Sequence, residues 1–152
     1  MGDHMRVSAK GRYGLAAMTH IASQYETGVP ITIISIAEKL GISKIYLEQV
    51  FSLLKRANLV ISIKGAQGGY QLAKAPVKIN ALEVLSAIEL SLFEKTEDAT
   101  SNHCPEIDKA LQNSIFTLLD NSVQNLLSNI TLVDLVIEME KNKSEEALMY
   151  FI

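Results

Sequence analysis

Three groups of residues in the first half of the chain are suited to binding DNA. Arg6, Lys10 and Arg12 are basic and lie at the start of a helical pattern, where side chains and helix N–H groups can both hold a phosphate. Other polar residues recur at helical spacing from residue 43 to residue 56, and a glycine-rich turn follows at residues 64–69. The candidates that these patterns provide are Arg6, Lys10, Arg12, Ser43, Lys44, Gln49, Lys55, Lys64, Gln67, Gly68 and Gly69.

The polar residues that begin at residue 43 belong to a pattern of helix, tight turn and helix between Ile36 and Val50. Gly41 occupies the turn, where a left-handed backbone favours glycine, and Ser43 can cap the second helix by accepting a backbone N–H. The apolar residues recur at positions that face a shared core. This arrangement predicts a helix-turn-helix of the kind that reads DNA.

The second helix of this motif separates its two faces at helical spacing. The apolar face comprises Tyr46, Leu47, Val50, Phe51, Leu53 and Leu54, and the other face comprises Lys44, Ile45, Glu48, Gln49, Ser52, Lys55 and Arg56. An ordinary amphipathic helix with a solvated polar face has the same pattern. The elements that follow favour DNA binding.

A β-hairpin is predicted directly after the second helix. The run from Leu59 to Lys64 is β-branched and apolar, residues 65–69 form a turn, and Tyr70 to Ala73 form the return strand. In this position the hairpin is typical of the wing of a winged helix, whose glycines let the backbone approach a phosphate or enter a minor groove. A glycine-rich hairpin by itself could equally be a plain turn.

Charge is divided unevenly along the chain, although its net value is only -3. Residues 1–80 carry ten Lys and Arg against four Asp and Glu, whereas residues 81–152 carry four against thirteen. The basic half is therefore the half that contains the helix-turn-helix, as phosphate binding requires.

Residues 1–4 resemble the remnant of an expression tag, with Met5 as the native start, and we find neither a leader nor a membrane span. We expect a cytoplasmic protein.

The second half is predicted to be helical. A capping box of Asn80 and Glu83 starts a helix to Leu90, and an acidic loop at residues 94–102 leads to a long helix from Pro105 to about Leu127. Its apolar stripe predicts a twofold dimer, with packing inside one chain as the alternative. The dimerisation candidates are Leu111, Ile115, Leu118, Val123 and Leu126. We expect Thr131 to cap a short final helix, followed by a charged linker at residues 141–146 and an apolar end.

Two other classes of function fit the sequence less well. An enzyme is disfavoured because His20 lies on an apolar helix, His103 is isolated and no glycine-rich phosphate loop follows a strand. A pure interaction module would use the long helix and the apolar end without DNA. A gel shift with operator DNA separates that class from a regulator.

Four motifs of the chain resemble the Rrf2 family of bacterial winged-helix regulators. They are Lys10-Gly11-Arg12-Tyr13-Gly14, Tyr46-Leu47-Glu48-Gln49, Gly68-Gly69-Tyr70 and Asn129-Ile130-Thr131-Leu132. The resemblance implies a mainly α fold, a winged helix-turn-helix with a short β-hairpin wing and a long C-terminal dimerisation helix. It also implies homodimers on palindromic double-stranded operators. By position, it places Tyr46, Glu48 and Gln49 at bases or phosphates and the segment from Lys10 to Tyr13 at the DNA backbone.

The single cysteine, Cys104, bears on the sensing mechanism. The cluster-binding branch of the family has three cysteines in this region, and an iron–sulfur cluster needs about four ligands. We therefore predict a regulator with no cofactor and no metal site. The alternatives are a thiol- or redox-responsive regulator that uses Cys104, a loop thiol without a role, or a cluster-binding member.

The C-terminal residues Tyr150, Phe151 and Ile152 resemble the end of the family's cysteine-metabolism repressors. That resemblance implies a repressor of cysteine or sulfur metabolism genes, held by cysteine synthase (O-acetylserine thiol-lyase) through the terminal carboxylate. The alternative is a tail that packs on its own dimer. We assign residues 5–80 to a DNA-binding domain and residues 81–152 to a helical region for dimerisation and partner binding.

Overall fold

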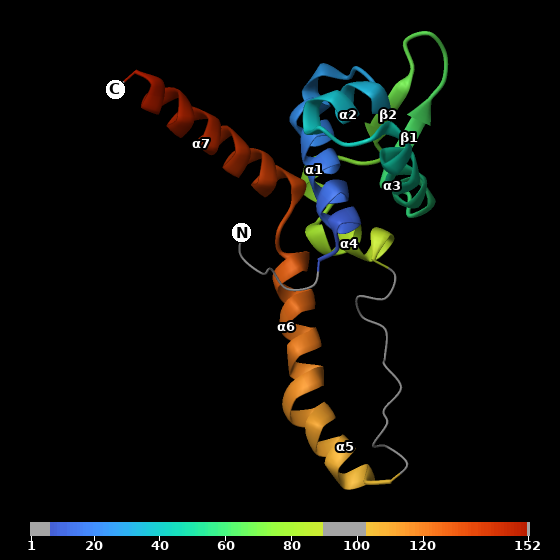
Figure 1. Cartoon of the computed structure of the whole chain (residues 1–152), viewed down its shortest axis with the longest axis vertical. Helices are drawn as coiled ribbons and strands as arrows, with labels where there is room; N and C mark the ends of the chain where they lie inside the picture. Colours follow the sequence, from blue (N-terminus) through green and yellow to red (C-terminus); the bar gives the residue numbers. More distant parts are fainter. Residues whose placement is uncertain (1–6, 90–102, 152) are drawn as a thin grey trace.

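A computed structural model describes residues 7–89 and 103–151. The first helices, α1 (Ala9–Ser23), α2 (Ile33–Leu40) and α3 (Lys44–Arg56), precede an antiparallel hairpin of β1 (Val60–Ile63) and β2 (Gly69–Leu72). Four more helices follow: α4 (Ala81–Ile88), α5 (Pro105–Leu111), α6 (Thr117–Ser128) and α7 (Leu132–Tyr150). A π-helical stretch, Gln112–Phe116, makes α5 and α6 continuous (Figure 1). The mainly α fold with a helix-turn-helix and a hairpin is confirmed.

Local capping defines the helix-turn-helix. The Thr32 hydroxyl accepts the Ser35 N–H at 3.1 Å to start α2, and the Ser43 hydroxyl accepts the Tyr46 N–H at 3.1 Å to start α3. Between them Gly41 has a φ of 67°, in the left-handed region where a side chain is strained. The predicted turn at Gly41 and the predicted cap at Ser43 are confirmed.

A single hydrophobic core lies under these elements. Its fully buried members include Met18 of α1, Ile36 of α2 and Phe51 of α3. Val84 of α4 and Leu132 of α7 belong to the same cluster, so the core includes residues on both sides of the predicted boundary at residue 80. The division into two domains stays a prediction. None of the described helices combines the length and apolarity needed to cross a membrane.

The end of the chain differs from the sequence prediction. Thr131 and Asp134 form the expected capping box, but the helix they start runs for 19 residues to Tyr150. The predictions of a short final helix and of a charged linker at residues 141–146 are therefore wrong. The helix continues because the segment from Leu132 to Tyr150 lacks glycine and proline and is rich in helix-forming Lys, Glu, Ala and Leu. An ion pair between Lys143 and Glu140 at 3.6 Å further supports it.

Smaller differences concern the ends of two other helices. The sequence pattern predicts a first helix that continues to Tyr25, but the helix ends at Ser23 and Tyr25 lies in a short 3₁₀ turn, Tyr25–Thr27. The helix that begins at Ala81 ends at Ile88, while Leu90 and the acidic loop at residues 94–102 lie outside the described residues.

Candidate nucleic-acid interface

Helix α3 has the two faces that its sequence predicts. Leu47, Val50, Phe51 and Leu54 are buried, whereas the candidates Lys44, Glu48, Gln49 and Lys55 are exposed. Lys44 and Glu48 form an ion pair at 3.7 Å on the exposed face. A face that is polar, exposed and free of core packing can enter a major groove.

The start of α1 lies beside this face of α3. Lys10 lines a groove together with Glu48, Gln49 and Ser52 of α3. The rings of Tyr13 and Tyr46 meet edge to face, with centroids 5.5 Å apart, so the two helices are also joined by an aromatic contact. The structure thus brings together residues predicted to contact phosphates and residues predicted to read bases.

Two N–H groups at the start of α1 are bonded within the protein. The Ser8 N–H donates to the Glu89 carboxylate and the Gly11 N–H donates to the Ser8 hydroxyl at 3.1 Å, so these two donors are occupied within the protein. The side chains of Lys10 and Arg12 stay candidates for phosphate contact at this end of α1, and Arg12 is exposed. Arg6 lies outside the described residues.

The predicted DNA-binding residues of the wing differ in their exposure to solvent. Lys64 and Gln67 are exposed at the tip of the hairpin. Gly68 and Gly69 are half-buried, and a Cβ at either would overlap a backbone oxygen, that of Ile63 or that of Ile31. These glycines are required by the protein's own close backbone contacts, which is a reason distinct from the expected approach to DNA.

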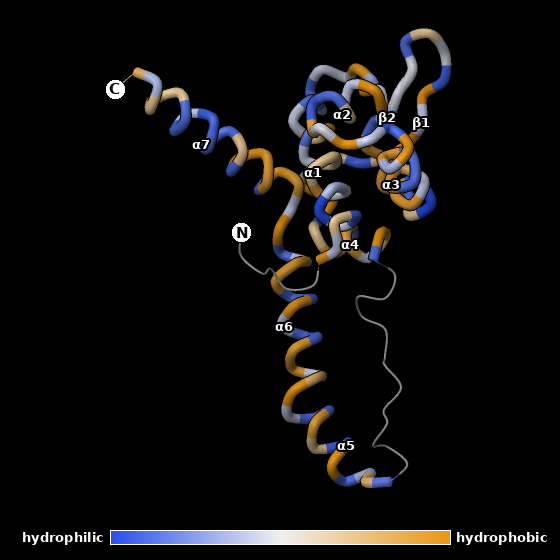
Figure 2. The backbone as a smooth tube through the Cα atoms, viewed as in Figure 1, coloured by the Kyte–Doolittle hydropathy of each residue, from blue (hydrophilic) through white to orange (hydrophobic). Residues whose placement is uncertain are grey.

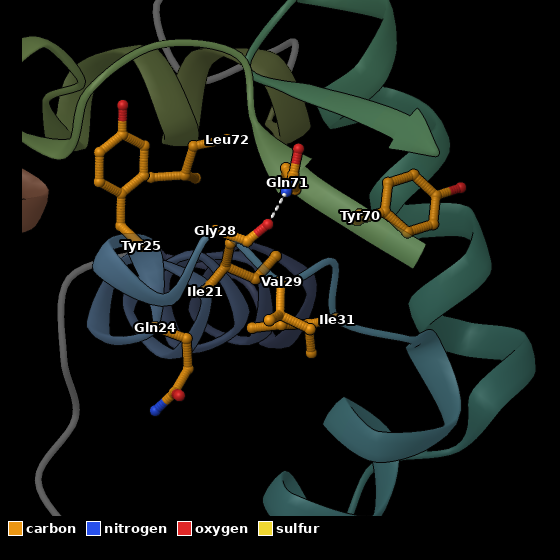
Figure 3. A pocket seen from close by; sticks show the side chains of 9 residues that line it. All are labelled: Ile21, Gln24, Tyr25, Gly28, Val29, Ile31, Tyr70, Gln71 and Leu72. Atoms are coloured by element: carbon orange, nitrogen blue, oxygen red, sulfur yellow. Dashed lines mark hydrogen bonds between the residues drawn. The ribbon is translucent and has the colours of Figure 1, made fainter. Parts of the chain in front are cut away.

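The base of the wing is tied to the loop that precedes α2. Ile31 and Tyr70 exchange two backbone hydrogen bonds, of 2.9 and 2.7 Å, and the Gln71 amide donates to the Gly28 carbonyl at 2.7 Å (Figure 3). A cavity of about 320 Å³ lies between these residues and the end of α1, with no charged side chain in its lining. The sequence pattern indicates no role for Gln71, because its partner is 43 residues away.

The predicted dimerisation residues are uncovered in the single chain. Ile115, Leu118 and Leu126 are 50%, 58% and 62% exposed, and Leu111 and Val123 are half-buried. Figure 2 shows apolar residues recurring along α5 and α6, which extend away from the α1–α3 body. Apolar side chains exposed in such number indicate a surface that a partner covers.

The remaining candidates do not form a reactive site among the described residues. Cys104 is half-buried and directly precedes α5, and no group of three His, Cys, Asp or Glu is placed to hold a metal ion within residues 7–89 and 103–151. Burial lowers the pKa of His20, and Lys39 and Lys143 lower it further. The charged neighbours that shift this pKa are lysines, whereas a carboxylate commonly orients a catalytic histidine.

The C-terminal candidates lie at the end of α7. Tyr150 and Phe151 are 83% and 90% exposed, and Ile152 lies outside the described residues. The helix, and not a flexible spacer, therefore carries Tyr150 and Phe151 away from the body (Figure 1).

Known proteins are similar to this chain in sequence and in fold. The family model described as "Rrf2: Iron-dependent Transcriptional regulator" matches residues 7–138. The HTH-type transcriptional regulator IscR of Enterobacter sp. (strain 638) is 40% identical over 136 residues, which are 90% of this chain and 82% of that protein. The structure of CymR (YrzC), the global cysteine regulator of B. subtilis, has a TM-score of 0.71 at 33% identity and covers 89% of this chain and 98% of its own.

T. potens IscR also has a TM-score of 0.71 at 33% identity, and the similarity covers 91% of this chain and 90% of that one. These relatives are named as regulators, as expected for a chain that is not an enzyme. With its winged helix-turn-helix and a match over most of its length, this chain belongs to the Rrf2 family of DNA-binding transcriptional regulators.

Proposed function

We propose that the protein is a cytoplasmic, homodimeric repressor that binds a palindromic operator through α3 and the wing. The observation that carries this proposal is the grouping of Lys10 of α1 with Glu48 and Gln49 on the exposed face of α3. Phosphate contacts at this surface would fix the position of the helix, while amide and carboxylate groups would read base edges. Lys64 and Gln67 of the wing would contact the adjacent backbone or minor groove.

A gel shift with random-sequence duplex DNA at increasing salt tests this function. A DNA-binding surface of this kind should retard the duplex at low salt and release it progressively as counterions compete. A pure interaction module that uses only α5, α6 and α7 would leave the duplex unshifted at every salt concentration.

Dimerisation would supply the second half-site. The exposed stripe on α5 and α6 is suited to pairing with its own copy about a twofold axis. Linking two weak half-site contacts in this way raises the affinity for a palindrome by a factor of about 10² to 10⁴.

An iron–sulfur cluster does not fit the donor set of this chain. Cys104 is the only cysteine in the sequence, and with the neighbouring His103 one chain offers two of the about four ligands that a cluster needs. We infer a regulator that works without a cluster, although its family is described as iron-dependent. Redox sensing by Cys104 stays a prediction.

Regulation of cysteine or sulfur metabolism also stays a prediction. The structural similarity to B. subtilis CymR favours it, whereas the curated relatives carry the name IscR. Cysteine synthase as a partner for Tyr150, Phe151 and Ile152 depends only on the sequence resemblance.

Replacing Lys64 with alanine should weaken binding to all duplexes by a similar factor. Lys64 is exposed at the end of β1, where a phosphate contact carries no sequence information. Because each protomer would then neutralise one phosphate fewer, the slope of log affinity against log salt should fall in magnitude by about 2 for a dimer. Fluorescence anisotropy titrations over a salt series measure both effects.

Lys78→Ala is the matched control, because it removes the same charge from the exposed turn before α4. It should leave the salt slope close to that of the wild type. A Lys64→Ala loss limited to preferred sequences would contradict a phosphate contact.

A further inference from the structure

Glu89 joins the end of α4 to the start of α1. It is the residue that ends α4, and its carboxylate accepts the N–H of Ser8, the residue that caps α1. A Cβ on Gly11 would overlap the same carboxylate oxygen, so the Glu89 side chain would have to shift if residue 11 carried a side chain. The positive end of the helix dipole further favours a carboxylate there.

The first turn of α1 also carries proposed DNA contacts. Lys10 lines the groove beside α3, Arg12 is exposed, and Tyr13 contacts Tyr46. The start of α1 is therefore held both by Glu89, at Ser8, and by Tyr46, at Tyr13. A shift of this turn would move both basic side chains relative to the reading face of α3.

Helix α4 is itself held firmly at its other end. Asn80 and Glu83 form a capping box, and Glu83 also pairs with Lys74 at 2.8 Å. The Ala81 N–H donates to the Ile130 carbonyl at 2.8 Å and the Leu132 N–H donates to the Ile79 carbonyl at 2.9 Å, which joins the start of α4 to the junction of α6 and α7. With its buried face in the core, α4 gives Glu89 a fixed position.

We propose that Glu89 is a positioning residue for DNA binding, which holds the first turn of α1 so that Lys10 and Arg12 contact phosphates. This inference rests on the proposed function of that turn. The predicted change in DNA affinity is opposite to the one expected from charge alone, because a carboxylate near a phosphate-binding surface should repel DNA. If Glu89 acts only through its charge, its removal strengthens DNA binding; if it positions the turn, its removal weakens binding.

The test compares variants of the full-length protein on a random-sequence duplex over a range of salt. Glu89→Ala should weaken binding about tenfold, the size of a hydrogen bond to a charged group. It should also lower the magnitude of the salt slope by about 1 for each phosphate that the protein no longer neutralises. Glu89→Gln keeps an oxygen acceptor for the Ser8 N–H and should restore affinity to within about twofold of the wild type.

Gly11→Ala supplies an independent route to the same displacement. Its Cβ would push the Glu89 carboxylate away while alanine favours the helix, so it should weaken binding without preventing folding. Combined with Glu89→Ala it should add almost no further loss, because both changes disrupt the same interaction between Glu89 and α1. Glu106→Ala, which removes an exposed carboxylate from α5, is the charge control and should leave the salt slope unchanged.

The outcomes separate the inference from the function on which it rests. Tighter or unchanged binding by Glu89→Ala overturns the positioning role, as does a Glu89→Gln variant that binds as weakly as Glu89→Ala. Fully additive losses for Gly11→Ala and Glu89→Ala overturn it too. If Lys10→Ala and Arg12→Ala leave DNA binding unchanged, the proposed contacts at α1 are wrong, whatever Glu89 does.

Discussion

Replacing Leu118 with lysine is expected to convert the proposed dimer into monomers and to lower operator affinity by at least about a hundredfold. Leu118 is 58% exposed in the single chain, near the middle of the apolar stripe of α5 and α6. In a twofold dimer the change would place one buried ammonium group from each copy in the shared interface. The cost of removing these charges from water and the repulsion between them would both oppose association. Sedimentation equilibrium measures the dimer, and anisotropy measures operator binding.

Gln124→Lys is the matched control for this prediction. Gln124 is exposed on the same helix but lies on the side opposite the stripe, and the substitution adds the same charge. It should remain dimeric and bind operator. An intact dimer in Leu118→Lys would place the interface elsewhere.

Loss of the Gln49 amide should reduce sequence preference more than overall DNA affinity. Gln49 is exposed on α3 beside Lys10, where its amide can form two hydrogen bonds with one base edge. Gln49→Ala should therefore weaken binding to a preferred duplex about tenfold to a hundredfold, and binding to random duplexes less than about threefold. Parallel anisotropy titrations with the two duplexes measure the ratio.

Lys64→Ala provides the contrasting variant, because it should lose affinity by the same factor on both duplexes. If Gln49→Ala also loses equal factors on preferred and random DNA, Gln49 contacts the backbone and does not read a base.

The helix-turn-helix could be predicted because its signals are local. Thr32, Gly41 and Ser43 each act within three or four residues of their own position, and the apolar spacing of α3 defines its buried face. The same reasoning predicts the capping boxes at Asn80 and Thr131. Such signals depend on covalent neighbours and survive without knowledge of the tertiary structure.

The prediction for the end of α7 is wrong because a run of charged residues does not by itself make a linker. Four of the six residues from Lys141 to Glu146 are lysine or glutamate, which favour a helix, none is glycine or proline, and the cap at Thr131 has already started the helix. Helix propensity over the whole segment is the better guide.

Long-range contacts could not be predicted from the sequence. Glu89 meets Ser8 across 81 residues, and Gln71 meets Gly28 across 43. Neither contact has a periodic or capping signature, because each depends on how α4 and the wing pack against α1. For the same reason, nothing in the sequence indicates that the Ser8 N–H donates to Glu89.

The most direct test of a dimeric regulator that reads DNA through α3 is selection of binding sequences from a random duplex library by the wild-type protein. We predict enrichment of an inverted repeat whose half-sites lie about one helical turn apart, as two copies of α3 related by a twofold axis require. The enriched duplex should bind two protomers. A pool that stays random after repeated selection, or an enriched site without twofold symmetry, would contradict this mode of binding.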